Sequence, residues 1–487
     1  MQKNKSLKKN FIMNIILTSS AYIFPLITFP YISRILGATG NGKINFADSI
    51  VSYFIMIAML GIPVYGIRAC AKVKNDKEKL SSTVYELLII NTITTIISYL
   101  LLFVALNFVP KFAEYRTLIM ILSSSIFLNC IGIEWLFKAC EEYSYITIRS
   151  LIFKTLSIIL MFLLVKSPND IEIYAFIMVI SSSFSYIFNF MRLHQYVLPM
   201  KKLKLNFKKH IKPIFTFFLL SVSWVIYTHL DVTMLGFISS DQEVGYYSAA
   251  VKIKNILVSG VSALGTVLLP RLTTYANENE ESFYKLLKKD FSFIIIASFF
   301  FIGFLVINAK EVLIFLSGDG YLAAIPAMQV ILFTILFIGL STMTGTNILI
   351  PKGKENITIK ANVFGIIINF ILNLLLISSY GAMGAAIATL IGEAVIFLYE
   401  AFYLKSEFRK IYNSKTVING LISVVLSIIL VLIIKPFVIK LNVFVLIILL
   451  GIVYSSMYIL CLLLLKERII VNIFDNFLKK FKRKEIV

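Results

Sequence analysis

The chain has 487 residues, of which 59% are hydrophobic and only 15% are charged, and its formal net charge is +21 at pH 7. Soluble globular domains keep about 25% charged residues and about 45–50% apolar ones, so this composition excludes an ordinary soluble domain. Apolar stretches of membrane-spanning length recur from one end of the chain to the other. Because backbone polar groups inside a bilayer need hydrogen bonds within the protein, we expect an all-α polytopic membrane protein.

The apolar stretches predict about fourteen transmembrane helices. In chain order they cover residues 11–36, 42–67, 80–106, 115–138, 145–166, 171–194, 213–238, 243–270, 290–309, 322–347, 356–377, 381–404, 416–435 and 442–465. Most Lys and Arg residues then fall on the side that holds both termini, and the positive-inside rule makes that side cytoplasmic. We therefore expect both termini to be cytoplasmic, the basic surplus to be set by topology and no nucleic-acid partner.

The polar segment 194–213 divides the first twelve predicted spans into two sets of six. Both sets contain the residues LG, a short outer turn and then the pattern G-x4-A-x2-I, carried by Gly42, Ala47 and Ile50 and again by Gly245, Ala250 and Ile253. This repeat predicts two six-helix lobes around a central cavity, followed by two extra helices. The expected parts are an N-lobe at 1–200, a C-lobe at 201–410, an appendix at 411–465 and a basic amphipathic cytoplasmic tail at 466–487.

The last two predicted spans and the tail differ from the lobes. Spans 416–435 and 442–465 hold only scattered small polar groups, so we expect them to face lipid on all sides. In the tail, apolar residues at helical spacing face lysines on the opposite side: Ile470, Phe474, Phe477 and Phe481. This pattern suits a helix lying on an anionic membrane surface, and a positive-inside anchor with no further role is the alternative.

The predicted span 243–270 carries a polar stripe whose members are three or four residues apart, so they lie on one side of a helix. The members are Val244, Ser248, Lys252, Asn255, Ser259, Ser262 and Thr266. An ionisable group at mid-helix costs about 2.5–3.5 kcal/mol on insertion scales, so Lys252 is expected to face a cavity or a partner. We expect the stripe to line a polar cavity; alternatively, its hydroxyls bond to their own helix and join neighbouring helices.

Other polar residues lie within predicted spans, among them Asp48, Asp231, Asn369, Asn373 and Glu393. Asp231 and Lys252 lie at similar depths on either side of one turn. Asp231 therefore either pairs with Lys252 as a structural bridge or binds a ligand or an ion. We expect Asp231, Asp48 and Glu393 to be the candidates for coupling to a proton or sodium gradient.

The sequence contains no arrangement typical of bond-breaking chemistry. Its histidines are scattered, and no loop is long enough for a folded catalytic platform. The four cysteines lie in or beside spans without metal-ligand spacing: Cys70, Cys130, Cys140 and Cys461. We expect a transporter and not an enzyme, with no catalytic residues, no metal and no cofactor.

Three hairpins carry a resemblance to a known family. The segment "DVTMLGFISSDQEVGYYSAAVKI" resembles the span seven–eight hairpin of polysaccharide-unit (Wzx-type) flippases, within the multidrug/oligosaccharidyl-lipid/polysaccharide exporter superfamily. "FPYISRILGATGNGKINFADSI" is similar to that family's first hairpin, and "YGAMGAAIATLIGE" to its span eleven–twelve hairpin. With the predicted spans, the resemblance covers nearly the whole chain.

The resemblance implies a flippase of the bacterial cytoplasmic membrane. It would move undecaprenyl-diphosphate-linked oligosaccharide units from the inner to the outer leaflet by alternating access, for capsule or O-antigen-like polymers. The implied contacts to the anionic head group are Lys252, Arg34, Lys154 and Arg271. The implied contacts to the sugars or the cavity are Asn255, Ser248, Ser259, Asn369 and Asn373. Membrane lipids, a polysaccharide polymerase and a chain-length regulator are the expected partners of a monomer. The alternatives are a multidrug or organic-cation antiporter of the same superfamily, or a flippase for lipid-linked peptidoglycan precursors or teichoic-type units.

Overall fold

The computed structural model describes residues 7–200, 203–472 and 474–475, and these residues form helices and turns without a strand. Ten helices in this part of the chain are long and apolar enough to cross a membrane, or up to eleven if one bent pair forms a single span. The expected all-α polytopic membrane fold is therefore confirmed. The chain divides into two compact units, residues 1–245 and 246–487, and each is described by itself.

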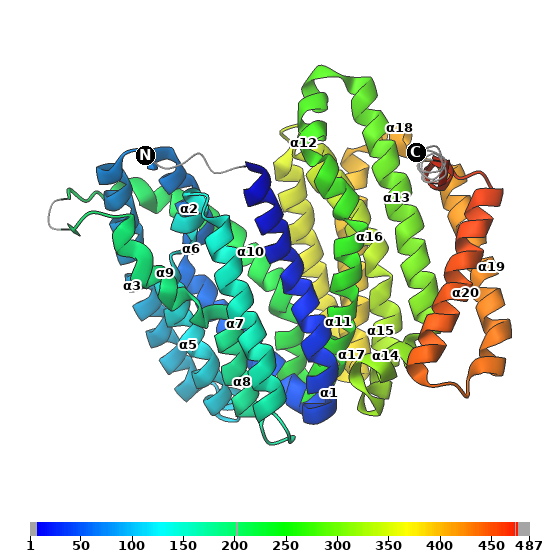
Figure 1. Cartoon of the computed structure of the whole chain (residues 1–487), viewed down its shortest axis with the longest axis horizontal. Coiled ribbons are helices and arrows are strands. Elements are labelled where there is room, and N and C mark those ends of the chain that lie inside the picture. The colour runs from blue at the N-terminus through cyan, green and yellow to red at the C-terminus, as the bar shows by residue number, and fades with distance from the viewer. Residues whose placement is uncertain (1–6, 201–202, 473, 476–487) are drawn as a thin grey trace, which may run out of the picture. The chain divides into compact units, whose positions relative to one another are not determined.

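The described residues of the first unit form eleven segments of α-helix or π-helix and one 3-10 turn (Figure 1). They are α1 (Leu7–Met59), α2 (Ile62–Val73), α3 (Lys77–Phe108), α4 (Pro110–Ala113), α5 (Arg116–Gly132), α6 (Glu134–Ala139), α7 (Tyr143–Leu164), α8 (Ile171–Val179), the π-helix η1 (Ile180–Phe184), α9 (Tyr186–Arg192), the 3-10 helix η2 (Leu193–Gln195) and α10 (Lys208–Ile238).

Helix α11 (Asp241–Val261) runs from the first unit into the second. The helices that follow are α12 (Ala263–Glu278), α13 (Glu280–Ile307), α14 (Ala309–Ser317), the 3-10 helix η4 (Asp319–Ala324), α15 (Ile325–Leu332), α16 (Thr334–Ser341), the π-helix η5 (Thr342–Leu349), α17 (Glu355–Tyr403), α18 (Lys405–Ile411), α19 (Ser414–Val438) and α20 (Val443–Leu464).

Two of the longest helices change direction at a glycine that lies where two predicted spans meet. Within α1, Gly37 has φ 64° and ψ −175°, and within α17, Gly381 has φ 50° and ψ −128°. Only glycine adopts such left-handed φ values without a steric penalty from Cβ. The predicted span 11–36 thus lies in α1, whereas span 42–67 begins in α1 and ends in α2. Spans 356–377 and 381–404 both fall on α17, apart from the last residue of the second. The exact number of fourteen and the division into lobes and appendix remain predictions.

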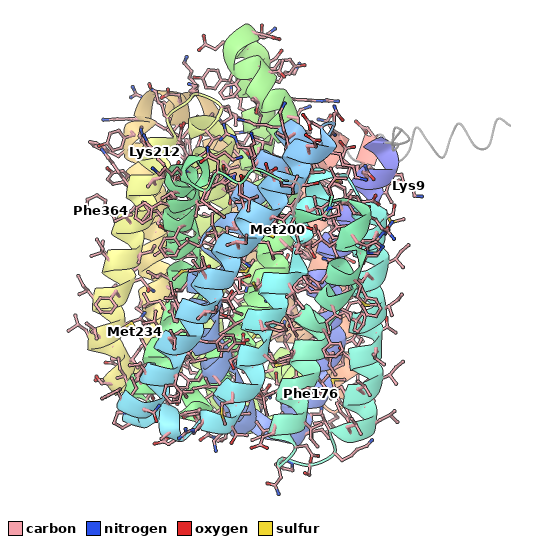
Figure 2. The ribbon with its side chains drawn as sticks, turned by 90° about the vertical axis from the view of Figure 1, so that its left-hand side faces the viewer. Lys9, Phe176, Met200, Lys212, Met234 and Phe364 are labelled. Atoms are coloured by element: carbon pink, nitrogen blue, oxygen red, sulfur yellow. The ribbon has the colours of Figure 1, made fainter. Side chains whose placement is uncertain are left out.

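Exposed apolar side chains mark the surface that would face lipid. Phe176 on α8 and Phe364 on α17 point outward among many other apolar residues (Figure 2). In the same view, Lys212 and Met234 lie toward opposite ends of α10. Such large exposed apolar areas are rare in soluble monomers but are required of a protein dissolved in a bilayer.

The last two membrane helices do not face lipid on all sides, so that expectation was wrong. In the second unit, α13, α19 and α20 lie side by side (Figure 1) and share a core that contains the buried Tyr454 and Tyr458. The Tyr458 hydroxyl donates to the Ile296 carbonyl at 2.9 Å. Gly303 of α13 makes room for the other ring, because a Cβ there would lie 2.3 Å from the Tyr454 hydroxyl. The large rings of Tyr454 and Tyr458 bury apolar area against α13. In the sequence these tyrosines stand among apolar residues, so hydropathy did not separate the packed face from the lipid-facing one.

The predicted span 243–270 is not one continuous helix. It consists of α11 and α12, which meet at Ser262 with a bend of 40°. The break follows Ser259 and Gly260, and Gly/Ser positions are common sites of helix kinks. The polar stripe therefore continues from one helix to a second that has a different direction. In the tail, Ile470 packs against the core of α13, α19 and α20 and Phe474 is exposed, whereas Phe477 and Phe481 lie outside the described residues.

Membrane orientation can be tested with single cysteines in a variant whose four native cysteines, all buried, are replaced. Asn41 in the first outer turn is only 3% exposed, so Thr39, which is exposed, is the better reporter. We expect a membrane-impermeant maleimide to label Thr39→Cys in intact cells, and Lys204→Cys only after permeabilisation. Labelling of Lys204→Cys but not Thr39→Cys in intact cells would reverse the orientation.

Candidate functional site

The repeated glycine motif brings two hairpins of the first unit into backbone contact. A Cβ atom added at Gly42 would lie 1.6 Å from the Asp241 carbonyl oxygen, and one added at Gly245 would lie 2.0 Å from the Ala38 carbonyl oxygen. Ala38 precedes Gly42 by about one helical turn, and Asp241 precedes Gly245 by the same distance in sequence. The contact is therefore reciprocal: each motif glycine faces the carbonyl one turn before the other glycine.

Aromatic packing surrounds this contact. Phe46 packs edge-on against Tyr115 and Phe237, with ring centroids 4.9 and 5.4 Å apart. The Tyr115 hydroxyl donates to the Asp241 carboxylate. Gly236 lies directly over Phe46, because a Cβ at this position would be 2.0 Å from the ring. The LG dipeptide at Leu235 thus supplies a buried leucine and a glycine on which an aromatic ring rests.

Two of the four expected head-group cations lie in the first unit. Lys154 on α7 is half-buried, and its Nζ donates to Ser20 Oγ at 2.8 Å and lies 5.5 Å from the centre of the Phe24 ring. It makes no ion pair with any described residue. Arg34 is exposed, and its guanidinium donates to the Pro30 carbonyl at 2.6 Å. Lys154 is therefore a partly desolvated cation held by neutral groups, which is an arrangement that favours an anionic ligand.

The other two expected cations belong to the second unit. Lys252 is half-buried on α11, and Arg271 is exposed on α12. Their contact with a head group remains a prediction. The proposed bridge from Lys252 to Asp231, which lies in residues 1–245, also remains a prediction.

The expected sugar-contacting residues differ in their surroundings. Asn255 is exposed on α11, whereas Ser248 is buried and its Oγ has no hydrogen-bond partner among the described residues. Ser259 donates to the Ile256 carbonyl of its own helix at 2.6 Å, as the alternative interpretation of the stripe requires. On α17, Asn373 Nδ2 donates to Asn369 Oδ1 at 3.1 Å. These two amides share one face of α17, but the structure assigns none of these residues a role in binding.

The three acids expected to couple transport to an ion lie on three different helices. Asp48 is half-buried on α1, Asp231 is 7% exposed on α10, and Glu393 is 3% exposed on α17. Near Asp231, the Thr233 hydroxyl donates to Ser49 Oγ at 3.1 Å, so a polar network joins α10 to α1. Ion coupling by these acids remains a prediction.

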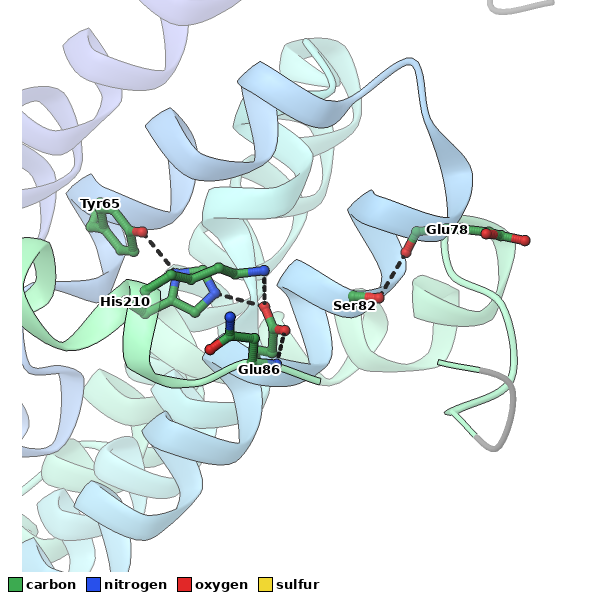
Figure 3. Close-up of polar contacts among 7 residues, drawn as sticks. Tyr65, Glu78, Ser82, Glu86 and His210 are labelled. Atoms are coloured by element: carbon green, nitrogen blue, oxygen red, sulfur yellow. Dashed lines mark hydrogen bonds and ion pairs between the residues drawn. The ribbon is translucent and has the colours of Figure 1, made fainter. Parts of the chain in front are cut away.

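A buried carboxylate that the sequence interpretation missed lies in the first unit (Figure 3). Glu86 on α3 is fully buried. Its Oε2 lies 2.8 Å from Lys209 Nζ and 2.7 Å from His210 Nε2. Its Oε1 accepts a hydrogen bond from the backbone N–H of Asn206. The Tyr65 hydroxyl is 2.7 Å from His210 Nδ1. Because an ionised carboxylate can only accept, His210 carries a hydrogen on Nε2. The cluster fastens the first turn of α10, and Asn206 just before it, to α2 and α3.

A model of the family described as "Polysaccharide biosynthesis protein" matches residues 7–276, more than half of the chain. The chain belongs to this family. The match includes both glycine hairpins, so the resemblance inferred from the hairpins is confirmed.

Relatives of this polysaccharide biosynthesis protein include two described as putative O-antigen transporters. The one from Shigella dysenteriae is 28% identical over 400 residues, which cover 81% of this chain and 98% of the relative. The one from Escherichia coli (strain K12) is 26% identical over 406 residues, which cover 81% of this chain and 96% of the relative. Both alignments span nearly the whole relative, and both relatives are named as transporters and not as enzymes.

Among solved structures, the inward closed conformation of the lipid II flippase MurJ is similar in fold. Its TM-score is 0.70 at 16% sequence identity, and the match covers 93% of this chain and 100% of that one. At this identity the likeness shows the fold alone. It supports a multi-pass helical membrane fold for this member of the polysaccharide biosynthesis family.

The second unit of the protein contains two further buried acids, Asp290 and Glu400, which were not among the residues that the sequence singled out as candidates. Asp290 on α13 accepts from Asn347 Nδ2 at 2.8 Å, and Glu400 on α17 accepts from the Thr344 hydroxyl. Asn347 and Thr344 both lie in the π-helix η5, and π-helical turns are frequent at functional sites. Asp290 sits at the edge of its predicted span, where an acid is usually taken as interfacial. Glu86 and Glu400 lie inside predicted spans. Because a charged side chain in a membrane span is costly, their position alone could have marked them as candidates.

Proposed function

We propose that the chain flips undecaprenyl-diphosphate-linked oligosaccharide repeat units from the inner to the outer leaflet of the bacterial cytoplasmic membrane, for assembly of a capsule or O-antigen-like polymer. The observation that carries the proposal is the family match over residues 7–276 together with two putative O-antigen transporters that align over 81% of the chain. The same observation favours an oligosaccharide unit over an organic cation or a peptidoglycan precursor.

The chemistry of the chain is consistent with this substrate. A pyrophosphate head group needs cations in a site of low dielectric, where charge-assisted hydrogen bonds are strong. Lys154 is half-buried without an ion pair among the described residues, and Lys252 is half-buried on the polar stripe. In this proposal each lysine contacts the diphosphate at some stage of the cycle, the asparagines of α11 and α17 contact the sugars, and two conformations give alternating access. A proton or sodium gradient drives the cycle.

The direct experiment is removal of the gene from its natural host. Loss of the protein should leave lipid-diphosphate-linked oligosaccharide on the inner leaflet and should eliminate the surface polymer, and a plasmid copy should restore it. A host that keeps normal surface polymer and accumulates no lipid-linked unit would refute the proposal.

The head-group role of the lysines predicts a specific loss. Lys154→Ala and Lys252→Ala should each reduce surface polymer at least tenfold at unchanged membrane abundance, which corresponds to about 1.4 kcal/mol or more of lost interaction. Lys154→Arg and Lys252→Arg should retain part of the activity, because the positive charge remains. The matched control is Lys166→Ala, since Lys166 is exposed just beyond the end of α7 and its Nζ donates only to the Phe162 carbonyl among the described residues. Wild-type polymer levels in both alanine variants would remove the lysines from the binding site.

A further inference from the structure

Asp290 on α13 is a buried carboxylate with an unused oxygen. Its exposed fraction is 0%, and Oδ2 accepts the one hydrogen bond, from Asn347 Nδ2 at 2.8 Å. Its Oδ1 is buried and has no hydrogen-bond partner among the described residues. Nor does Asp290 form an ion pair with any residue in the described part of the chain. An unpaired buried carboxylate costs several kcal/mol, so a charge-compensating partner is expected to bind there.

Neighbouring oxygens are unused as well. Asn347 Oδ1 is buried and has no partner among the described residues, while its Nδ2 is committed to Asp290. The Ser262 Oγ is likewise buried without a described partner. Ser262 lies one turn before Gly265 at the start of α12, on the same side of that helix. Buried polar atoms are satisfied in more than about 90% of cases, so two orphan oxygens on the mutually hydrogen-bonded Asp290 and Asn347 indicate a missing ligand.

Gly265 makes the approach of α12 to this region possible. A Cβ atom at Gly265 would lie 2.4 Å from Asn347 Nδ2 and 3.2 Å from each carboxylate oxygen of Asp290. Only a residue without a side chain can therefore occupy this position while Asp290 and Asn347 remain in place. Val261 and Ile294 both border Gly339 of α16, which places the end of α11 against α13 one turn beyond Asp290. Asp290 and Asn347 thus lie beside the first turn of α12, which begins at the helix break, and Asn347 itself belongs to the π-helix η5.

We propose that Asp290, Asn347 and Ser262 bind a sodium ion. Carboxylate, amide and hydroxyl oxygens are the ligands of hard cations, and the single carboxylate matches a single positive charge. Within the described residues, no group of three or more His, Cys, Asp or Glu could hold a metal ion, so the site lacks the carboxylates that a divalent ion would require. A proton would satisfy Asp290 alone, whereas a sodium ion satisfies the oxygens of all three residues. Use of this ion to drive transport rests on the proposed function, but its binding does not.

Sodium binding is measured on the purified full-length protein as the thermal unfolding midpoint in NaCl against choline chloride at equal ionic strength. The wild type should be stabilised saturably by sodium, on the order of 5 °C at about 100-fold the dissociation constant. Asp290→Asn should lose this response and should be at least as stable as the wild type in choline chloride, because it removes the unpaired charge. Asn347→Ala should need at least tenfold more sodium for half of the effect.

The matched control is Glu281→Gln, since Glu281 is exposed on the same helix and should leave the sodium response unchanged. A wild type that unfolds at the same temperature in both salts would overturn the proposal, and so would an Asp290→Asn variant that still responds to sodium. Because no transport is measured, a failed sodium response refutes the site and leaves the flippase proposal standing. Loss of the flippase proposal likewise leaves the binding result intact.

Discussion

Replacement of Gly42 by alanine is expected to lower the unfolding temperature and the folded yield of the protein. An alanine in a helix is normally more stable than glycine by about 1 kcal/mol. Here the new methyl group would overlap the Asp241 carbonyl oxygen, 1.6 Å away, which is backbone and cannot rotate aside. The two hairpins must therefore separate, and overpacking of this kind costs about 1–3 kcal/mol, occasionally more. Thermal unfolding of the purified variant measures the loss, and surface polymer should fall with it.

The reciprocal geometry supplies a second variant and a control. Gly245→Ala should behave like Gly42→Ala, because its methyl group would meet the Ala38 carbonyl oxygen at 2.0 Å. Gly260→Ala is the control, since Gly260 lies in α11 with no neighbouring heavy atom within 4 Å. That control should unfold at or above the wild-type temperature. Wild-type stability in both Gly42→Ala and Gly245→Ala would show that the two backbones do not approach as described.

Replacement of Glu86 by alanine should destabilise the first unit by about 2–4 kcal/mol. The substitution leaves the His210 Nε2–H and the Asn206 backbone N–H without their acceptor in a region where Glu86 itself is fully buried. The Lys209 side chain is 46% exposed, so water can solvate its charge, and we therefore expect less than the full cost of breaking a buried ion pair. The measurement is the free energy of unfolding, or the resistance of the 194–212 segment to limited proteolysis in membranes.

Two variants on the same helix test whether the carboxylate itself matters. Glu86→Gln keeps the size and one acceptor oxygen, so it should retain about half of the stability lost in Glu86→Ala. Glu78→Gln is the control, because Glu78 is exposed two turns earlier on α3 (Figure 3) and should have no measurable effect. If Glu86→Ala is as stable and as protease-resistant as Glu78→Gln, the cluster does not hold the segment in place.

The cluster also has a consequence for the proposed transport cycle. The segment 194–212 connects the two sets of predicted spans, and Glu86 binds its end to α3 while Tyr65 of α2 binds the same histidine. A movement of α10 must therefore carry α2 and α3 with it or break this cluster. In the proposed cycle, the free energy of the cluster adds to the barrier between conformations only where the movement breaks the cluster.

The sequence by itself determined the class of the protein and much of its local structure. Long apolar stretches predict membrane helices because hydrophobic length is a property of each segment alone, whatever it packs against. The motif around Gly42 and Gly245 was visible as a repeat because each copy is a short contiguous pattern in the chain. The family of the protein could also be inferred from the sequence, since the residues of each hairpin are contiguous in the chain.

Only the tertiary structure decided what these residues contact. A side chain is excluded at Gly42 by the carbonyl of Asp241, which is far away in sequence, and at Gly303 by the Tyr454 hydroxyl. Asp290 stood at the edge of a predicted span, and its unused oxygen became apparent only beside Asn347 from another helix. The helix break at Ser262 could not be predicted from the spacing of polar residues, because the same spacing continues on both sides of the bend. Hydropathy and periodicity describe one helix at a time, whereas close approach, burial of charge and unsatisfied polar atoms depend on which helices become neighbours.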